Sequence, residues 1–184
     1  MIVIKLGGSL AEIGVLKQCL ARAQEKFLCP STVIVPGGGK FADQVRMAQT
    51  AWHFDDRTAH RMALLAMQQM ALLMHGLAPQ LQLAGTIQEI HRCLSGNQNV
   101  LWSPDITELD RAGVRSEWDV TSDSLAAWLA GKLAADELIL VKSAKIDAGC
   151  NLTDLVRRKV IDSAFPEFYR HASYQLSVIN YQEF

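Results

Sequence analysis

Short apolar runs alternate along the chain with longer segments in which apolar residues recur every three or four positions. A short continuous apolar run is typical of a buried strand, and the three-to-four spacing is typical of a helix with one apolar face. The pattern predicts strands at 2–6, 32–35, 99–102, 138–141 and 176–179. It predicts helices at 13–27, 41–52, 59–77, from 86 onward, and from 121 or 122 to 129.

Strands that alternate with helices imply right-handed crossovers and a sheet covered on both faces. The predicted fold class is therefore α/β, with a mostly parallel central sheet. In such sheets ligands bind beyond the carboxyl ends of the strands. Lys5, Gly37, Ser103 and Lys142 fall at those ends, so these four positions are expected along one edge of the sheet.

Composition narrows the class of protein. The 184 residues suit one domain, and the net charge of −1 comes without a cluster of Lys or Arg. We therefore expect neither a nucleic acid nor an anionic membrane as partner. The chain has no apolar stretch long enough for a transmembrane helix, and its first apolar run is too short for a signal peptide. Four scattered cysteines without a Cys-x-x-Cys pair favour free thiols and a cytoplasmic location.

Two glycine-rich turns join strands to helices and are the strongest candidates for chemistry. The first is Lys5-Leu6-Gly7-Gly8-Ser9, where a helix start and a nearby lysine suit a phosphate group. The alternative is an ordinary tight turn with a solvent-facing lysine. The second is Pro36-Gly37-Gly38-Gly39-Lys40, which suits a ligand lying against the backbone or is a flexible loop. Neither turn is a P-loop or a dinucleotide fingerprint.

Carboxylates near two predicted helix starts allow two interpretations each. Asp123 either caps a helix or accepts hydrogen bonds from active-site lysines, and the sequence spacing favours neither interpretation over the other. His53, Asp55, Asp56 and His60 resemble a metal cluster, but Asp55 or Asp56 is also an obvious N-cap. We favour capping or substrate contact over a metal there, and expect no bound metal at these residues.

The motifs together resemble the amino acid kinase family. Residues 3–10 (VIKLGGSL) are similar to its opening, residues 33–39 (VIVPGGG) to its second glycine motif, and residues 119–127 (DVTSDSLAA) to the segment with its organising aspartate. The resemblance runs from Met1 to about Lys142. It implies a three-layer αβα sandwich of the carbamate-kinase-like type over residues 1–184, with a shortened C-terminal nucleotide-binding half.

The resemblance also implies site residues for ATP-dependent phosphoryl transfer with Mg²⁺. Lys5 and Gly8, with Gly7 and Ser9, would contact the transferring phosphoryl group, and Asp123 would hold Lys5. The acceptor would lie on Gly37, Gly38 and Gly39. The family's second phosphate-binding lysine has three candidates here, and these are Lys142, Lys145 and Lys159. Relatives are usually dimers or larger, so a homo-oligomer is expected.

One branch of the family is more similar still, on the strength of residues 60–67 and Trp118. Its members phosphorylate [5-(aminomethyl)furan-3-yl]methyl phosphate in methanofuran biosynthesis. That substrate would bring an amine to Asp55 or Asp56, with His60 in the same substrate-binding set. Two alternatives remain open at this point: a catalytically silent ligand-binding protein that kept the fold, and a metal or oxyanion store.

Overall fold

The computed structural model describes residues 1–26, 31–147 and 149–184, and a parallel sheet forms its centre. The strands are β1 (Ile2–Leu6), β2 (Thr32–Pro36), β3 (Gln82–Ala84), β4 (Val100–Trp102), β5 (Glu137–Lys142) and β6 (Gln175–Asn180). They are ordered β3-β4-β2-β1-β5-β6 in the described part of the chain, and every pair is parallel. The predicted α/β class and the parallel sheet are confirmed.

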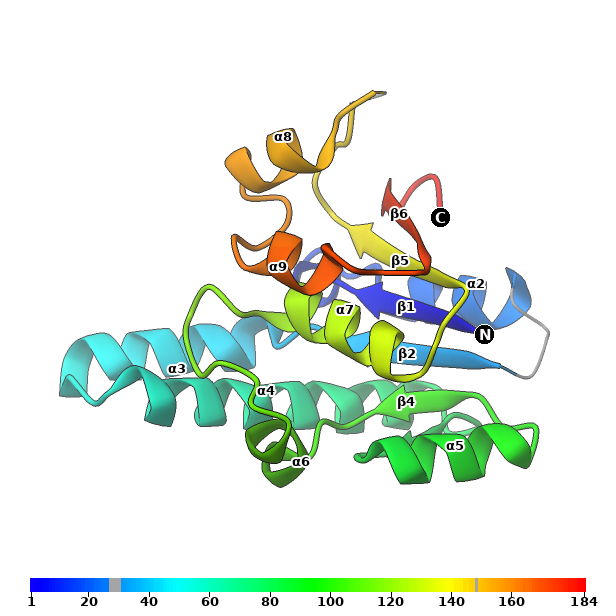
Figure 1. Ribbon diagram of the computed structural model, residues 1–184, viewed down its shortest axis with the longest axis horizontal. Helices are drawn as coiled ribbons and strands as arrows, with labels where there is room; N and C mark the ends of the chain where they lie inside the picture. Colours follow the sequence, from blue (N-terminus) through cyan, green and yellow to red (C-terminus); the bar gives the residue numbers. More distant parts are fainter. Residues whose placement is uncertain (27–30, 148) are drawn as a thin grey trace.

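Helices cover both faces of this sheet, so the architecture is a three-layer α/β sandwich (Figure 1). The helices are α1 (Ser9–Glu12), α2 (Leu16–Lys26), α3 (Gly39–Trp52), α4 (Asp56–Leu77), α5 (Ile87–Ser95), α6 (Ile106–Arg111), α7 (Ser122–Lys132), α8 (Leu152–Arg157) and α9 (Phe165–Tyr169). Figure 1 shows α7 and α9 in front of the sheet and α2 behind it.

Two hydrophobic cores separate the layers because successive strand residues point to opposite faces. Val3 and Leu140 belong to the core beneath α7 and α9. Ile4 and Ile139 belong to the core beneath α1 and α2. Lys5 and Lys142 continue the first series, two residues after Val3 and Leu140, so their side chains leave the sheet on the α7 side.

Helix starts follow the predicted capping chemistry. Asp55 is the N-cap of α4, and its side chain accepts a hydrogen bond from the Thr58 amide. Thr86 and Glu89 form a capping box at α5, where a helix was predicted to begin, with both reciprocal hydrogen bonds present. Of the two acidic residues considered before α4, the geometry selects Asp55.

The predicted helix 13–27 is wrong at its start. A single turn, α1, begins at Ser9, and the chain then breaks at Gly14, whose φ of +76° suits glycine. Ile13 lies in this break and is 50% exposed. The helix itself begins at Leu16, while the predicted end at Phe27 and the expected free thiol of Cys29 lie outside the described residues.

Strand β3 and the short helices α6, α8 and α9 were not predicted, because each is only a few residues long and shows little periodicity. In the predicted helix 41–52, Val45 is buried, whereas Trp52 is 78% exposed at the C-terminal end of α3. Cys19 is a buried free thiol, and Cys93 and Cys150 are half-buried free thiols.

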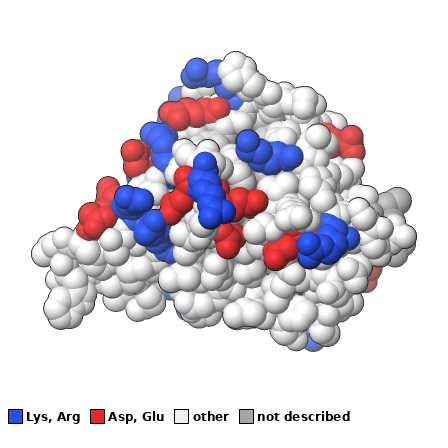
Figure 2. Space-filling view, turned by 60° about the horizontal axis from the view of Figure 1, so that its bottom comes forward, with Lys and Arg blue, Asp and Glu red and all other residues white. Residues whose placement is uncertain are grey.

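An uncharged surface accompanies α4, which carries no Lys, Arg, Asp or Glu after Arg61. Its solvent side exposes Leu65, Leu72, Leu73 and Leu77. Figure 2 shows a broad area without charged side chains below the band of charges that crosses the molecule. Despite this apolar character, none of the helices in the described ranges is both long and apolar enough to cross a membrane.

Candidate active site

Lys5, Asp123 and Lys142 meet in one buried cluster at the carboxyl edge of the sheet. Lys5 Nζ lies 2.9 Å from Oδ1 of Asp123, and Lys142 Nζ donates to Oδ2 across 2.5 Å. The three residues are between 4% and 8% exposed. Lys5 therefore does not point into bulk solvent, and the structure assembles the Lys5–Asp123 contact that the family resemblance implied.

The order of the strands explains why the cluster forms. β1 and β5 are neighbours, with Lys5 paired in register to Leu140, so Lys142 lies two residues further along on the same face. Helix α7 packs over β1 and β5, and its first turn carries Asp123. One carboxylate is thus placed between two ammonium groups that come from adjacent strands.

The cluster has an excess of positive charge. Burial raises the pKa of the Asp123 carboxyl, but Lys142 and Lys5 outweigh burial and hold that pKa well below its usual range. Burial, although Asp123 opposes it, and the nearby charge of Lys5 together lower the pKa of Lys142 to about 8. Two cations facing one buried carboxylate form a site that a further anion would stabilise.

The two glycine turns touch each other directly. A Cβ on Gly8 would lie 2.3 Å from the amide nitrogen of Gly39, and a Cβ on Gly37 would lie 2.4 Å from that of Gly8. The Gly37 amide also donates to the Leu6 carbonyl across 2.9 Å. Glycine is required at positions 8 and 37 because the backbones of the two turns approach each other closely, a reason for glycine that the sequence analysis did not provide. The ligand contact expected at the second turn stays a prediction.

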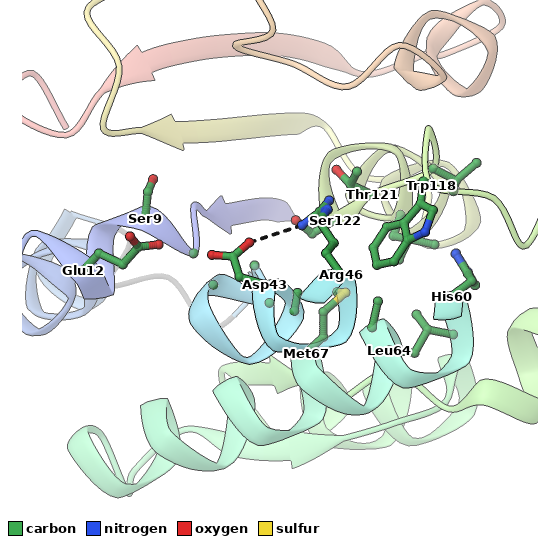
Figure 3. A pocket seen from close by; sticks show the side chains of 18 residues that line it. Ser9, Glu12, Asp43, Arg46, His60, Leu64, Met67, Trp118, Thr121 and Ser122 are labelled. Atoms are coloured by element: carbon green, nitrogen blue, oxygen red, sulfur yellow. Dashed lines mark hydrogen bonds and ion pairs between the residues drawn. The ribbon is translucent and has the colours of Figure 1, made fainter. Parts of the chain in front are cut away.

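A cavity of about 240 Å³ opens beside these turns (Figure 3). Its lining has a backbone part at Gly8 and Gly37–Gly39, a polar part, and an apolar part. The polar part includes Ser9, Glu12, Asp43, Arg46 and His60, and the apolar part includes Leu64, Met67, Trp118 and Leu125. The lining thus offers a small ligand apolar, charged and backbone groups.

Arg46 and Trp118 form the aromatic corner of the cavity. The Arg46 guanidinium lies 4.5 Å from the centroid of the Trp118 ring and 3.3 Å from Asp43. Trp118 donates from its indole nitrogen to Gln49, which fixes the ring. Figure 3 shows Asp43, Arg46 and Trp118 around one side of the cavity, with Leu64 and Met67 beneath.

His60 is buried at the edge of the same cavity, near Trp118 in Figure 3. Burial lowers its pKa below the ordinary histidine value, although contact with the Glu117 backbone and the charge of Asp110 oppose this shift. At neutral pH His60 is therefore an uncharged group that can donate one hydrogen bond and accept another.

Other residues predicted for the site lie elsewhere. Asp55 caps α4, and Asp56 accepts a hydrogen bond from Gln49; neither belongs to the cavity lining. Lys145 and Lys159 are exposed, and no ion pair of theirs occurs within residues 1–26, 31–147 and 149–184. Of the three candidates for the second phosphate-binding lysine, the structure brings Lys142 to Asp123.

Several residues of the site were missed by the sequence analysis. Arg46 lies on a polar helix face and carries no motif, and Ser143 meets Ser9 through a hydroxyl contact of 2.8 Å that joins the β1 and β5 loops. Asp162 accepts hydrogen bonds from the start of α7, although it lies 38 to 41 residues after its donors in the sequence. No local pattern reports contacts over such separations.

The two glycine-rich helix starts favour the binding of an anion, and the two buried ammonium groups favour the neutralisation of negative charge. An enzyme that moves a phosphoryl group between small anions needs both capacities. The fold and the site thus define a small-molecule kinase. The chain belongs to the amino acid kinase family, whose model matches residues 1–145.

Individual relatives agree with this assignment. The chain is 24% identical over 192 residues to the [5-(aminomethyl)furan-3-yl]methyl phosphate kinase of Methanocaldococcus jannaschii, covering 98% of this chain and 88% of that protein. The uridylate kinase of Archaeoglobus fulgidus has the same fold, with a TM-score of 0.74, 18% identity and coverage of 97% and 90%. The aspartate kinase of Synechocystis matches with a TM-score of 0.71 and 18% identity, over 98% of this chain and 38% of that one.

Proposed function

We propose that this kinase transfers the γ-phosphoryl group of ATP to the phosphate of a small phosphorylated amine, and that the acceptor is [5-(aminomethyl)furan-3-yl]methyl phosphate. The observation that carries the proposal is the buried Lys5–Asp123–Lys142 cluster. The three residues of the cluster do not line the cavity themselves, but Thr121 and Ser122, which directly precede Asp123, do. The similarity to the Methanocaldococcus jannaschii kinase supplies the candidate acceptor. The cytoplasmic location and the homo-oligomeric state stay predictions.

In this proposal an oxygen of the acceptor phosphate attacks the γ-phosphorus of ATP. The bond from the γ-phosphorus to the bridging oxygen breaks, so the products are ADP and the acceptor diphosphate. Lys5 and Lys142 neutralise negative charge on the transferring group, and Asp123 holds both ammonium groups in place. No covalent enzyme intermediate is involved, because positioning and charge neutralisation supply the catalysis.

The cavity offers a partner for each part of the acceptor. Helix α3 begins at Gly39 without a side-chain cap, so its free amide groups and positive dipole end favour the acceptor phosphate. The furan ring suits the apolar walls at Met67 and Trp118. The acidic residues of the lining are Glu12 and Asp43, so we assign the ammonium group to them in place of Asp55 or Asp56.

Mg²⁺ is proposed to enter with ATP as part of the substrate. Within the described residues, no three His, Cys, Asp or Glu side chains converge to hold a metal ion. Mg²⁺ in nucleotide sites is commonly held by the phosphates with one or two carboxylates, so a dedicated protein cage is not needed. The ion would offset the charge of the nucleotide phosphates.

The test is incubation of the protein with Mg-ATP and the furan phosphate, followed by phosphorus NMR for a diphosphate product. We expect product from the wild type and none above background from Lys5→Ala. Asp43→Asn should raise KM for the acceptor by about tenfold or more, because a hydrogen bond between charged groups is lost. The matched control Asp55→Asn should leave KM unchanged.

Two results would contradict the proposal. Faster phosphorylation of UMP than of the furan phosphate would show that the acceptor is wrong. Absence of product, together with a melting temperature that Mg-ATP does not raise, would favour the catalytically silent ligand-binding protein, since a nucleotide that binds the native state must stabilise it.

A further inference from the structure

Helix α7, which carries Asp123, has no cap of its own. Its N-cap residue is Thr121, whose side chain makes no capping hydrogen bond within the helix. The first amide groups of a helix need partners from outside the helical hydrogen-bond pattern. At α7 the partner comes from the connection between α8 and α9, in the form of the Asp162 carboxylate.

Both oxygens of Asp162 are used. Oδ2 accepts from the Thr121 amide at 3.1 Å, from the Thr121 hydroxyl at 2.7 Å and from the Ser124 amide at 3.0 Å. Oδ1 accepts from the Phe165 amide at 2.8 Å and from the Ser124 hydroxyl. Five donors therefore converge on one side chain, and four of them belong to the two residues that bracket Ser122 and Asp123.

The first turn of α7 contributes to both parts of the site, the cavity and the lysine cluster. Thr121 and Ser122 line the acceptor cavity, and Asp123 holds the two buried lysines. A shift of the turn would therefore move the cavity wall and the lysine pair together. Asp162 lies beyond residues 1–145, the part that the family model matches.

We propose that Asp162 is a positioning residue for phosphoryl transfer: by fixing the first turn of α7, it sets the orientation in which Asp123 presents Lys5 and Lys142. The inference rests on the kinase activity and on the roles proposed for the cluster. It assigns a function to a side chain that does not line the cavity.

Charge provides a second link between Asp162 and the cluster. The charged groups that face Lys142 are Lys5 from β1, Asp123 from α7 and Asp162 from the connection between α8 and α9. The Asp162 carboxylate raises the pKa of Lys142, in opposition to burial and Lys5. Removal of its charge should therefore lower the pKa of Lys142 further, an effect that loss of an ordinary helix cap would not produce.

The experiment compares Asp162→Ala with Asp105→Ala, which removes the cap of α6 at a residue that does not line the cavity. Both variants should lower the melting temperature, and Asp162→Ala should lower it more, because five donors lose their acceptor there and only one amide loses its acceptor in Asp105→Ala. Only Asp162→Ala should lower kcat, by about 100-fold, because displacement of reacting groups by about 1 Å has effects of that size. Asp162→Asn, which keeps the shape and removes the charge, covers the case in which Asp162→Ala does not fold.

A second readout does not depend on the acceptor. NMR titration of protein labelled at the lysine ε-carbons, with the Lys142 signal assigned by its loss in Lys142→Met, reports the pKa of Lys142 directly. It should be lower in Asp162→Asn than in wild type and unchanged in Asp105→Ala. If the wild type phosphorylates neither acceptor, the proposed function fails. The titration then remains as the test of whether Asp162 acts on the lysine cluster.

The inference is overturned by any of three results. These are a kcat of Asp162→Ala within twofold of wild type, an equal loss of kcat in Asp105→Ala, or an unchanged Lys142 titration in Asp162→Asn.

Discussion

Replacement of Lys142 by methionine should abolish most turnover and yet change the stability of the fold only slightly. Burial and Lys5 lower the pKa of Lys142 from its ordinary 10.5 to about 8 even though Asp123 is present. At about 1.4 kcal/mol for each tenfold change in proton affinity, the charged side chain costs the folded state roughly 3 kcal/mol at pH 7.

Methionine fills similar space without charge, and Lys5 remains 2.9 Å from Asp123. Loss of the second contact to Asp123 opposes the gain, so the net change in the free energy of unfolding should be between about −1 and +2 kcal/mol, well short of the roughly 3–5 kcal/mol lost when a buried pair is broken. Urea denaturation at pH 7 measures this change, and kcat with ATP measures the loss of activity.

The pH dependence provides a sharper test. The folded-state pKa of Lys142 lies below the unfolded value, so between about pH 8 and pH 10.5 the unfolded state binds more protons at this group. Its contribution to stability therefore rises with pH across that window. The stability of wild type minus that of Lys142→Met should increase from pH 8 to pH 10.5, and the subtraction removes the titration of other groups. A flat or falling difference, or wild-type kcat in the variant, would refute the reasoning.

Three further predictions concern Asp123, the contact between the glycine turns, and the exposed side of α4. Asp123→Asn leaves two buried ammonium groups without their carboxylate, so unfolding experiments should show a loss of about 3–5 kcal/mol, with no turnover; wild-type turnover would contradict its role. Gly8→Ala forces a Cβ to 2.3 Å from the Gly39 amide nitrogen and should cost about 1–3 kcal/mol and most activity, whereas Gly76→Ala, which meets nothing within 4 Å, should stabilise α4 slightly in thermal melts. Leu72 is 60% exposed on the uncharged side of α4, so Leu72→Glu should dissociate the expected homo-oligomer in sedimentation experiments; a monomeric wild type would exclude that assembly.

The sequence predicted those parts of the site that depend on strand ends. A buried strand followed by glycines has one dominant geometry in a parallel sheet, so the edge position of Lys5 and Gly37 followed from local pattern. Capping at Asp55 was equally local, because an N-cap needs only its own first turn. These features could be inferred without knowledge of which strands are neighbours.

The remaining features depend on neighbours in space. Asp123 could be read as a cap or as a partner for lysines, and the choice follows from the adjacency of β1 and β5, which strand order alone determines. The glycines at 8 and 37 were attributed to ligand contact, and the sequence did not reveal that the two turns also touch each other. Asp162 lies about forty residues from the helix that it caps, so hydrophobic periodicity contains no information about it.

The charge balance of the cluster connects stability with function. Two buried ammonium groups share one carboxylate. Because burial and Lys5 lower the pKa of Lys142, the charged form of this lysine is at a disadvantage in the folded protein. An anion bound beside both lysines would reverse this disadvantage and raise that pKa, because opposite charge favours the protonated form. In the proposed function, this cost to folding places positive charge in position before the phosphoryl group binds, so phosphate binding should stabilise the wild type more than it stabilises Lys142→Met.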